Sequence, residues 1–141
     1  MKSPHSIREG RAVRMPLSVT AEDMDLYLHL SGDDNPVHFS DAAAQSRGLK
    51  KRVVYGGLLV SAISRLLGTK LPGPGCVWQS LSINFRRPLH VGEQAEVRAA
   101  ATYVNSETGV LRLKIEILRG TELIADGQAQ AGFPPSEKAA S

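Results

Sequence analysis

An aspartate and a histidine five positions apart, Asp33 and His38, are the residues in this sequence best placed to do chemistry. They lie in segment 31–38, SGDDNPVH, which cannot form a regular helix because Pro36 lacks a backbone N–H and disfavours helical backbone at Asn35. The chain must turn between the carboxylate and the imidazole, so both can face one small volume. These two side-chain types suit proton transfer near neutral pH. The spacing therefore predicts an acid–base pair.

Two other interpretations of the same segment stay open. Asp, Asn and Pro are common in polar surface turns, so residues 33–36 could form such a turn with His38 only as a neighbour. His29, Asp33 and His38 could also ligate a metal ion. Three ligands around one turn are a weak signal for a metal site.

A glycine pair, Gly56-Gly57, precedes an apolar segment and offers a second chemical element. Glycine lets the backbone approach a ligand closely, and the N–H groups of a helix's first turn have no acceptor inside the helix. The positive end of the helix dipole lies at the same place. These N–H groups could stabilise negative charge on a bound carbonyl oxygen, as an oxyanion hole does. Alternatively, the glycines allow the helix to pack closely against the sheet. For Gly57 this explanation is as strong as contact with a ligand.

Segment 31–38, preceded by Tyr27, resembles the signature of the MaoC-like (R)-specific enoyl-CoA hydratases, also called hydratase 2. In words, the signature is a small residue, any residue, Asp, any residue, Asn, Pro, an aliphatic residue and His. The resemblance continues through 52–59, RVVYGGLL, and 85–93, FRRPLHVGE, and covers about residues 18–133. It implies a hot-dog fold, an antiparallel sheet wrapped around a long central helix.

The resemblance also implies roles for individual residues. Asp33 acts as base toward a water molecule held between Asp33 and His38, and His38 supplies a proton to the α-carbon of the substrate. The Gly56 N–H holds the thioester oxygen. Asn35 braces the loop beside the substrate, and Ser64 matches a serine on the same helix that lines the site.

Many relatives carry His-Gly-Met where this chain has Tyr55-Gly56-Gly57. Tyr55 is expected to form a wall of the substrate pocket and not to act as a catalyst. Gly57 is expected to contact the substrate beside it. The departure bears on the shape of the acyl pocket and on substrate preference, and leaves the proton-transfer pair intact.

The reaction that the resemblance implies is the reversible hydration of trans-2-enoyl-CoA to (R)-3-hydroxyacyl-CoA. It needs no metal and no cofactor other than the coenzyme A or phosphopantetheine of the substrate. Two alternatives stay open: a dehydratase for 3-hydroxyacyl chains on acyl-carrier protein, and a non-catalytic protein that binds acyl thioesters. Hot-dog thioesterases and dehydratases with a carboxylate on the central helix are disfavoured, because 56–68 contains no Asp or Glu.

Helices are expected on both sides of the motif. Thr20 is placed as an N-cap with Asp23 three residues on, in a capping-box position, so this helix leads into the Asp/His loop. A short helix is expected within 40–48. Residues 56–67 form a helix that is apolar nearly all round, which is typical of a buried helix, and Gly68 offers a C-terminal cap.

Strands are expected in the second half of the chain. Apolar and polar residues alternate with a period of two in four segments, 77–85, 97–103, 111–117 and 123–131. A first strand is expected within 8–17. The breaks between the four segments are short enough for antiparallel meander connections. Together these elements predict an α+β fold with one antiparallel sheet around a buried helix. The open sheet edges of a single such domain predict a homodimer.

Composition sets the class of protein. The 141 residues make one domain, 1–141, in which 1–6 and 134–141 are expected to be loose termini. A hydrophobic content of 42% and a charged content of 22% are typical of a soluble globular protein. No apolar run is long enough to cross a bilayer and no signal-like segment opens the chain, so the expectation is a cytoplasmic protein without a membrane partner. A single cysteine, Cys76, fits a reducing compartment.

The net charge of +3 does not indicate nucleic-acid binding, because the basic residues are scattered and no basic run is interleaved with aromatics. Arg86 and Arg87 are candidates to contact a phosphate of coenzyme A. His90 is expected on the surface, and Met15 and Met24 in the packing of the core.

Overall fold

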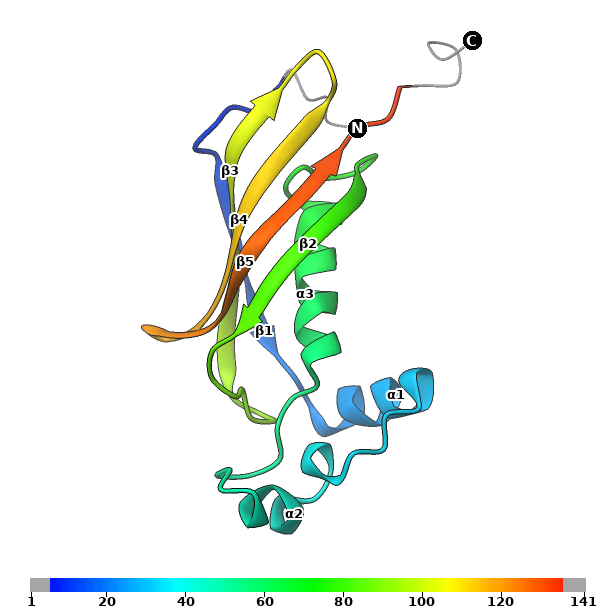
Figure 1. Cartoon of the computed structure of the whole chain (residues 1–141), viewed down its shortest axis with the longest axis vertical. Coiled ribbons are helices and arrows are strands. Elements are labelled where there is room, and N and C mark those ends of the chain that lie inside the picture. Colours follow the sequence, from blue (N-terminus) through cyan, green and yellow to red (C-terminus); the bar gives the residue numbers. More distant parts are fainter. Residues whose placement is uncertain (1–5, 136–141) are drawn as a thin grey trace.

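A five-stranded antiparallel sheet and one long helix packed against it make up most of the structure, with a smaller helical lobe at one end of that helix (Figure 1). The computed structural model describes residues 6–135. Of the termini expected to be loose, 1–6 and 134–141, only Ser6, Pro134 and Pro135 fall within the described residues.

The helices and strands lie close to their predicted positions. The helices are α1 (Ala21–Ser31), α2 (Asp41–Ser46) and α3 (Gly56–Thr69), with a 3-10 turn, η2 (Pro36–His38), between the first two. The strands are β1 (Ala12–Ser18), β2 (Val77–Phe85), β3 (Gln94–Asn105), β4 (Val110–Arg119) and β5 (Glu122–Gly132). The α+β fold with a central helix is therefore confirmed, and each predicted strand overlaps an observed one.

The strand order in the sheet is β1-β3-β4-β5-β2, and all neighbours are antiparallel. Strands β3, β4 and β5 form the predicted meander. The prediction is wrong at the break after β2, because β2 pairs with β5, for example Phe85 opposite Ala125. The chain after β2 does not turn back to pair β3 with β2, because Leu89 and His90 pair with the segment before α3. The Val54 N–H donates to the Leu89 carbonyl, and Val53 forms a β-bridge with His90.

The core lies between the sheet and one side of α3. This side presents Leu59, Ile63, Leu66 and Leu67, which are buried against apolar residues of the sheet. The expectation that the helix is buried all round is wrong for the single chain, because the sheet covers one side only and Ser64 and Arg65 are exposed.

The end of α3 also differs from the prediction. The helix runs past Gly68 to Thr69, and Lys70 is its C-cap, with a backbone N–H that donates to the Leu66 carbonyl. Gly68 is not among the glycines with positive φ, so it does not form the expected left-handed cap. Pro72 follows two residues after the cap and cannot continue a helix.

The first helix is fixed at both ends by the residues that the sequence indicates. The Thr20 hydroxyl accepts from the Asp23 N–H at 3.1 Å, and the Asp23 carboxylate accepts from the Thr20 N–H at 2.9 Å, which confirms the capping box. Gly32 ends the helix with a φ of 72°, and its N–H donates to the Leu28 carbonyl. Because both ends are fixed, α1 delivers the chain into the Asp/His loop at a defined position.

Further expectations concern two methionines and membrane-spanning helices. Met15 and Met24 are buried, which confirms their place in the core. Among residues 6–135, no helix combines the length and the apolar character required to span a bilayer.

Candidate active site

The loop that carries Asp33 and His38 is held by a ladder of side-chain to backbone hydrogen bonds, each spanning two residues. The Ser31 hydroxyl accepts from the Asp33 N–H at 3.1 Å, and the Asp33 carboxylate accepts from the Asn35 N–H at 3.1 Å. The Asn35 side chain then accepts from the Val37 N–H at 3.3 Å. Short polar side chains favour such bonds where the backbone leaves helical conformation. Asn35 therefore binds its own loop, and Asp33 keeps one carboxylate oxygen outside the ladder.

His38 closes the 3-10 turn and is partly buried. Its Nδ1 atom lies 2.8 Å from the carbonyl oxygen of Val53. A carbonyl oxygen only accepts, so Nδ1 carries the proton in this bond. The other ring nitrogen, Nε2, is the one that can exchange protons with water or a ligand.

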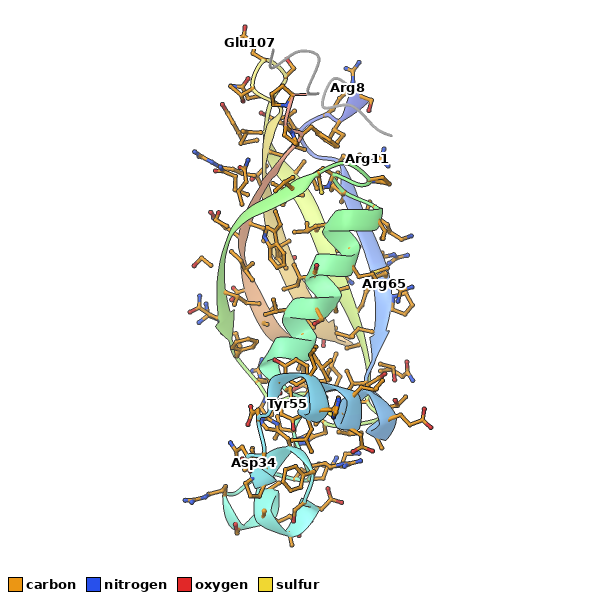
Figure 2. All side chains as sticks on the ribbon, turned by 90° about the vertical axis from the view of Figure 1, so that its right-hand side faces the viewer. Arg8, Arg11, Asp34, Tyr55, Arg65 and Glu107 are labelled. Carbon is orange, nitrogen blue, oxygen red and sulfur yellow. The ribbon has the colours of Figure 1, made fainter. Side chains whose placement is uncertain are left out.

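Tyr55 touches both predicted catalytic residues. Its side chain is 2% exposed, its ring stacks on the His38 imidazole with centroids 4.0 Å apart, and its hydroxyl donates to the Asp33 carbonyl at 2.7 Å. Burial, and next the negative charges of Asp33 and Asp34, raise the pKa of Tyr55, so its hydroxyl remains a donor. Figure 2 shows Tyr55 at the junction of α3 with the helical lobe, and Asp34 just beyond it. The Tyr55 side chain thus contacts both the backbone of Asp33 and the ring of His38.

A pocket of about 340 Å³ opens beside the start of α3 and is lined by His38 and Gly56 among others. Gly56 is the first residue of this helix, so its N–H has no acceptor within the helix. The ring of Phe85 lies 3.2 Å from where a Cβ of Gly56 would stand. The pocket therefore joins an imidazole, a helix N-terminus and an aromatic ring that sequence reasoning did not single out. Asp33 does not line this pocket and is exposed.

Gly57 and Ser64 are placed differently. A Cβ on Gly57 would collide with the Tyr27 hydroxyl, so this glycine serves close packing against α1. Ser64 is exposed on α3, eight residues beyond Gly56 and about 12 Å along the helix axis. The single chain therefore does not bring Ser64 to the pocket.

Two arginines complete the rim of the pocket. Arg86 pairs with Asp126 at 2.9 Å, and Arg87 lies 3.8 Å from Glu122 and donates to the Leu123 carbonyl. Both are about half exposed, so their charges remain accessible from the pocket. Contact of Arg86 and Arg87 with a phosphate stays a prediction.

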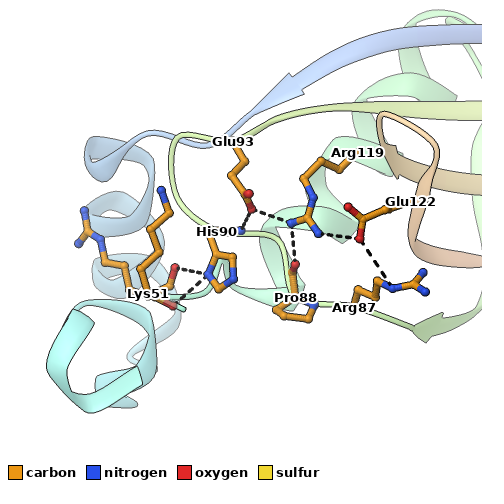
Figure 3. A network of polar contacts seen from close by, with 8 residues as sticks. Lys51, Arg87, Pro88, His90, Glu93, Arg119 and Glu122 are labelled. Carbon is orange, nitrogen blue, oxygen red and sulfur yellow. Dashed lines mark hydrogen bonds and ion pairs between the residues drawn. The ribbon is translucent and has the colours of Figure 1, made fainter. Parts of the chain in front are cut away.

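Behind this rim lies a polar network that sequence reasoning missed (Figure 3). His90 is 5% exposed, and its Nδ1 lies 2.9 Å from the Lys51 carbonyl, so the expectation that it is a surface residue is wrong. The cause is the pairing of residues 89–90 with the segment before α3, which no local pattern indicates. Glu93 accepts from the His90 N–H at 2.7 Å and from Arg119 at 2.8 Å.

The Glu93 carboxylate is stabilised in its charged form. Burial alone would raise its pKa, but hydrogen bonds from the His90 N–H and Arg119, together with the Arg119 charge, outweigh burial and hold the pKa below the ordinary value of 4.5. Arg119 also donates to the Pro88 carbonyl at 3.2 Å and to Glu122 at 3.3 Å. The network thus ties the pocket rim at 87–88 to the end of β4.

The metal alternative receives no support. Within the part of the chain that the structure describes, no group of three His, Cys, Asp or Glu side chains is arranged to hold a metal ion. His29, Asp33 and His38 are therefore not gathered as ligands.

The chain is similar to several known proteins. A 3-hydroxybutyryl-CoA dehydratase of Methylorubrum extorquens is 33% identical over 121 residues, which are 86% of this chain and 77% of the relative. An (R)-specific enoyl-CoA hydratase of Rhodospirillum rubrum is 28% identical over 128 residues, 91% of this chain and 89% of the relative. The solved structure of an (R)-hydratase from A. caviae involved in PHA biosynthesis matches with a TM-score of 0.87 and 29% identity, over 92% of this chain and 98% of that chain.

The fold is the hot-dog fold of this structural neighbour. The names of the relatives describe the addition and the removal of water, the reactions of hydro-lyases, and this chain is an enzyme of that class. Residues 3–114 match the family described as "MaoC like domain". The chain therefore belongs to the MaoC-like domain family.

Proposed function

We propose that the protein catalyses the reversible hydration of trans-2-enoyl-CoA to (R)-3-hydroxyacyl-CoA, with Asp33, His38 and Gly56 as its catalytic groups. The observation that carries the proposal is that Tyr55 contacts both Asp33 and His38 directly before the first residue of α3. His38 and the N-terminus of α3 line the same pocket, and Tyr55 links the backbone of Asp33 to the His38 ring.

The thioester carbonyl would accept from the Gly56 N–H at the positive end of α3. This contact draws electrons from the double bond toward the carbonyl and makes the β-carbon electrophilic. It also stabilises the enolate oxygen that forms when water adds, which is the part of the reaction where negative charge is greatest.

Asp33 and His38 would divide the proton transfers. Asp33 takes one proton from water as the water oxygen bonds to the β-carbon. His38, protonated on both nitrogens, gives its Nε2 proton to the α-carbon while Nδ1 remains bound to the Val53 carbonyl. The proton on Asp33 then returns to His38 through water, so the net change is the addition of one water molecule.

Coenzyme A is the proposed carrier of the acyl chain. The support is chemical: Arg86 and Arg87 are half-exposed cations on the pocket rim, where they suit the phosphates of a nucleotide. Both curated relatives described above are named for CoA thioesters.

We propose in addition that two copies of the chain associate. The exposed side of α3 and the free edges of β1 and β2 are the surfaces that a second copy would cover. Light scattering on the purified protein should give twice the chain mass, and a monomer mass would contradict this proposal.

The test is the hydration of crotonyl-CoA by the purified protein, followed by the loss of enoyl absorbance and by chiral analysis of the product. Formation of the (R)-alcohol supports the proposal. If a series of enoyl-CoA chain lengths gives no turnover with a folded protein, the CoA proposal fails. Turnover of crotonyl-acyl-carrier protein alone would then identify a carrier-protein dehydratase, and no turnover at all would favour a binding protein.

A further inference from the structure

We propose that Tyr55 is a positioning residue, which holds the acid and the base of the active site in one geometry through two separate contacts. This inference rests on the proposed function of Asp33 and His38. It departs from the expectation that Tyr55 is a wall of the substrate pocket, since Tyr55 does not line that pocket.

The first contact is made by the face of the ring. The imidazole of His38 stacks on Tyr55 with an angle of 27° between the planes. The ring of Tyr27 lies against Tyr55 as well, with centroids 4.6 Å apart, and the Tyr27 hydroxyl packs on Gly57. Tyr55 is therefore confined by both neighbours, and the plane of the His38 ring is set by a side chain that cannot easily move.

The second contact is made by the hydroxyl. It donates to the backbone carbonyl of Asp33 at 2.7 Å, across 22 positions of sequence. Asp33 is otherwise held by the local ladder through Ser31 and Asn35, which joins residues of the same loop. The other end of the loop is anchored at Val37 and His38, which both bond to Val53. The Tyr55 hydroxyl anchors the Asp33 end.

The backbone around Tyr55 completes the arrangement. The Val53 N–H donates to the Val37 carbonyl at 3.0 Å, and the Val53 carbonyl receives His38 Nδ1. Tyr55 is followed directly by Gly56. Residues 53–56 thus fix the base, the place of the acid and the first N–H of α3 together, so a displaced Tyr55 would disturb all three.

Two substitutions separate the contacts. Tyr55→Phe removes the hydroxyl and keeps the ring, so it should release Asp33 but leave His38 stacked. Tyr55→Leu removes both contacts. Small displacements of catalytic groups cost much more in turnover than in binding, so we expect kcat to fall about 10-fold to 100-fold in the first variant and further in the second, with KM changed less than about threefold. Tyr103→Phe, an exposed tyrosine on β3, is the matched control.

The experiment combines steady-state kinetics on crotonyl-CoA with proton NMR of the His38 ring in the same proteins. Stacking on Tyr55 shifts the His38 ring protons upfield, and this shift should persist in Tyr55→Phe and disappear in Tyr55→Leu. Circular dichroism confirms that each variant is folded.

Each outcome decides the proposal. Loss of kcat in Tyr55→Phe with the ring-current shift retained supports the two-contact arrangement. Wild-type kcat in both variants, or a raised KM with unchanged kcat, overturns it, because the second result would mark a pocket wall. If wild-type protein turns over no thioester, the proposed function fails, whereas the NMR shifts still show whether Tyr55 orients His38. Shifts equal in all three proteins would then overturn the positioning role.

Discussion

His38 Nδ1 lies 2.8 Å from the carbonyl oxygen of Val53, a residue 15 positions later in the chain. Because the carbonyl can only accept, this contact places a proton on Nδ1 and leaves Nε2 outside the bond. The same short segment, 53–56, also carries Tyr55 and the first residue of α3. The position of the Asp/His loop therefore depends on a strand-like segment that lies far from it in the sequence.

Gly57→Ala should destabilise the protein without a direct effect on chemistry. The added methyl group would overlap the Tyr27 side chain, and overpacking of this kind costs about 1–3 kcal/mol. Urea unfolding measures the loss. Adding Tyr27→Ala removes the overlapping ring, so the double variant should be less destabilised than the sum of the two single changes. Strict additivity would show that the two residues do not share this contact.

Gly56→Ala should lower activity with little effect on stability, in contrast to Gly57→Ala. Its methyl group would meet the ring of Phe85, which is 53% exposed and free to shift, so stability should change by less than about 1 kcal/mol. The same methyl enters the pocket where the thioester oxygen is proposed to bind, and kcat/KM should fall about 10-fold to 100-fold. Unchanged kcat/KM in a folded Gly56→Ala variant would speak against an oxyanion site here.

Arg87→Gln should weaken binding of the nucleotide part of coenzyme A. We expect KM for crotonyl-CoA to rise a few-fold with kcat unchanged. This rise in KM should become smaller at high salt concentration, because salt screens the exposed charge of Arg87. Crotonyl-pantetheine lacks the nucleotide phosphates, so its KM should not respond. Arg14→Gln, on the far strand β1, is the control. An equal rise in KM for both thioesters would exclude phosphate recognition by Arg87.

Glu93 should contribute to stability in a pH-dependent way. Its folded pKa is lower than the ordinary 4.5, so its contribution is fully present above about pH 4.5 and is lost as the pH falls through the folded pKa. Glu93→Gln should therefore cost about 1–3 kcal/mol at pH 7, since it breaks hydrogen bonds to a charged group. The difference from wild type should shrink below pH 4.5.

Denaturant unfolding at a series of pH values checks this prediction. Glu107→Gln, on an exposed turn, should leave the profile of wild type unchanged. A Glu93→Gln penalty that stays constant from pH 7 to pH 3 would mean that the carboxylate charge is not the source of the stability.

Local sequence patterns predicted the helices and strands well, because each helix or strand is determined largely by residues close together in the sequence. The period-two alternation of 111–117 marks β4, and the Thr20–Asp23 capping box marks the start of α1. Long-range pairing left no such local signal. The pairing of β2 with β5, and the segment before α3 that buries His90, both join residues far apart in sequence.

In the candidate site, too, local features were predicted and long-range contacts were not. The turn at Pro36 and the position of Gly56 at the start of α3 follow from residue types, and both were predicted. The contacts of Tyr55 with Asp33 and His38 cross 22 and 17 positions, so no spacing rule could reveal them. Ser64 was placed in the site by resemblance alone, and in the single chain it lies apart from the pocket.

The most direct test of the account is crotonyl-CoA hydration by Asp33→Asn and His38→Ala. Each substitution removes one proton-transfer group, and kcat should fall by about 10²–10⁴ in each. The matched controls are Asp34→Asn, the neighbouring carboxylate, and His29→Ala on α1, which should keep wild-type kcat. Near-wild-type turnover by a folded Asp33→Asn or His38→Ala protein would contradict the proposed acid–base pair.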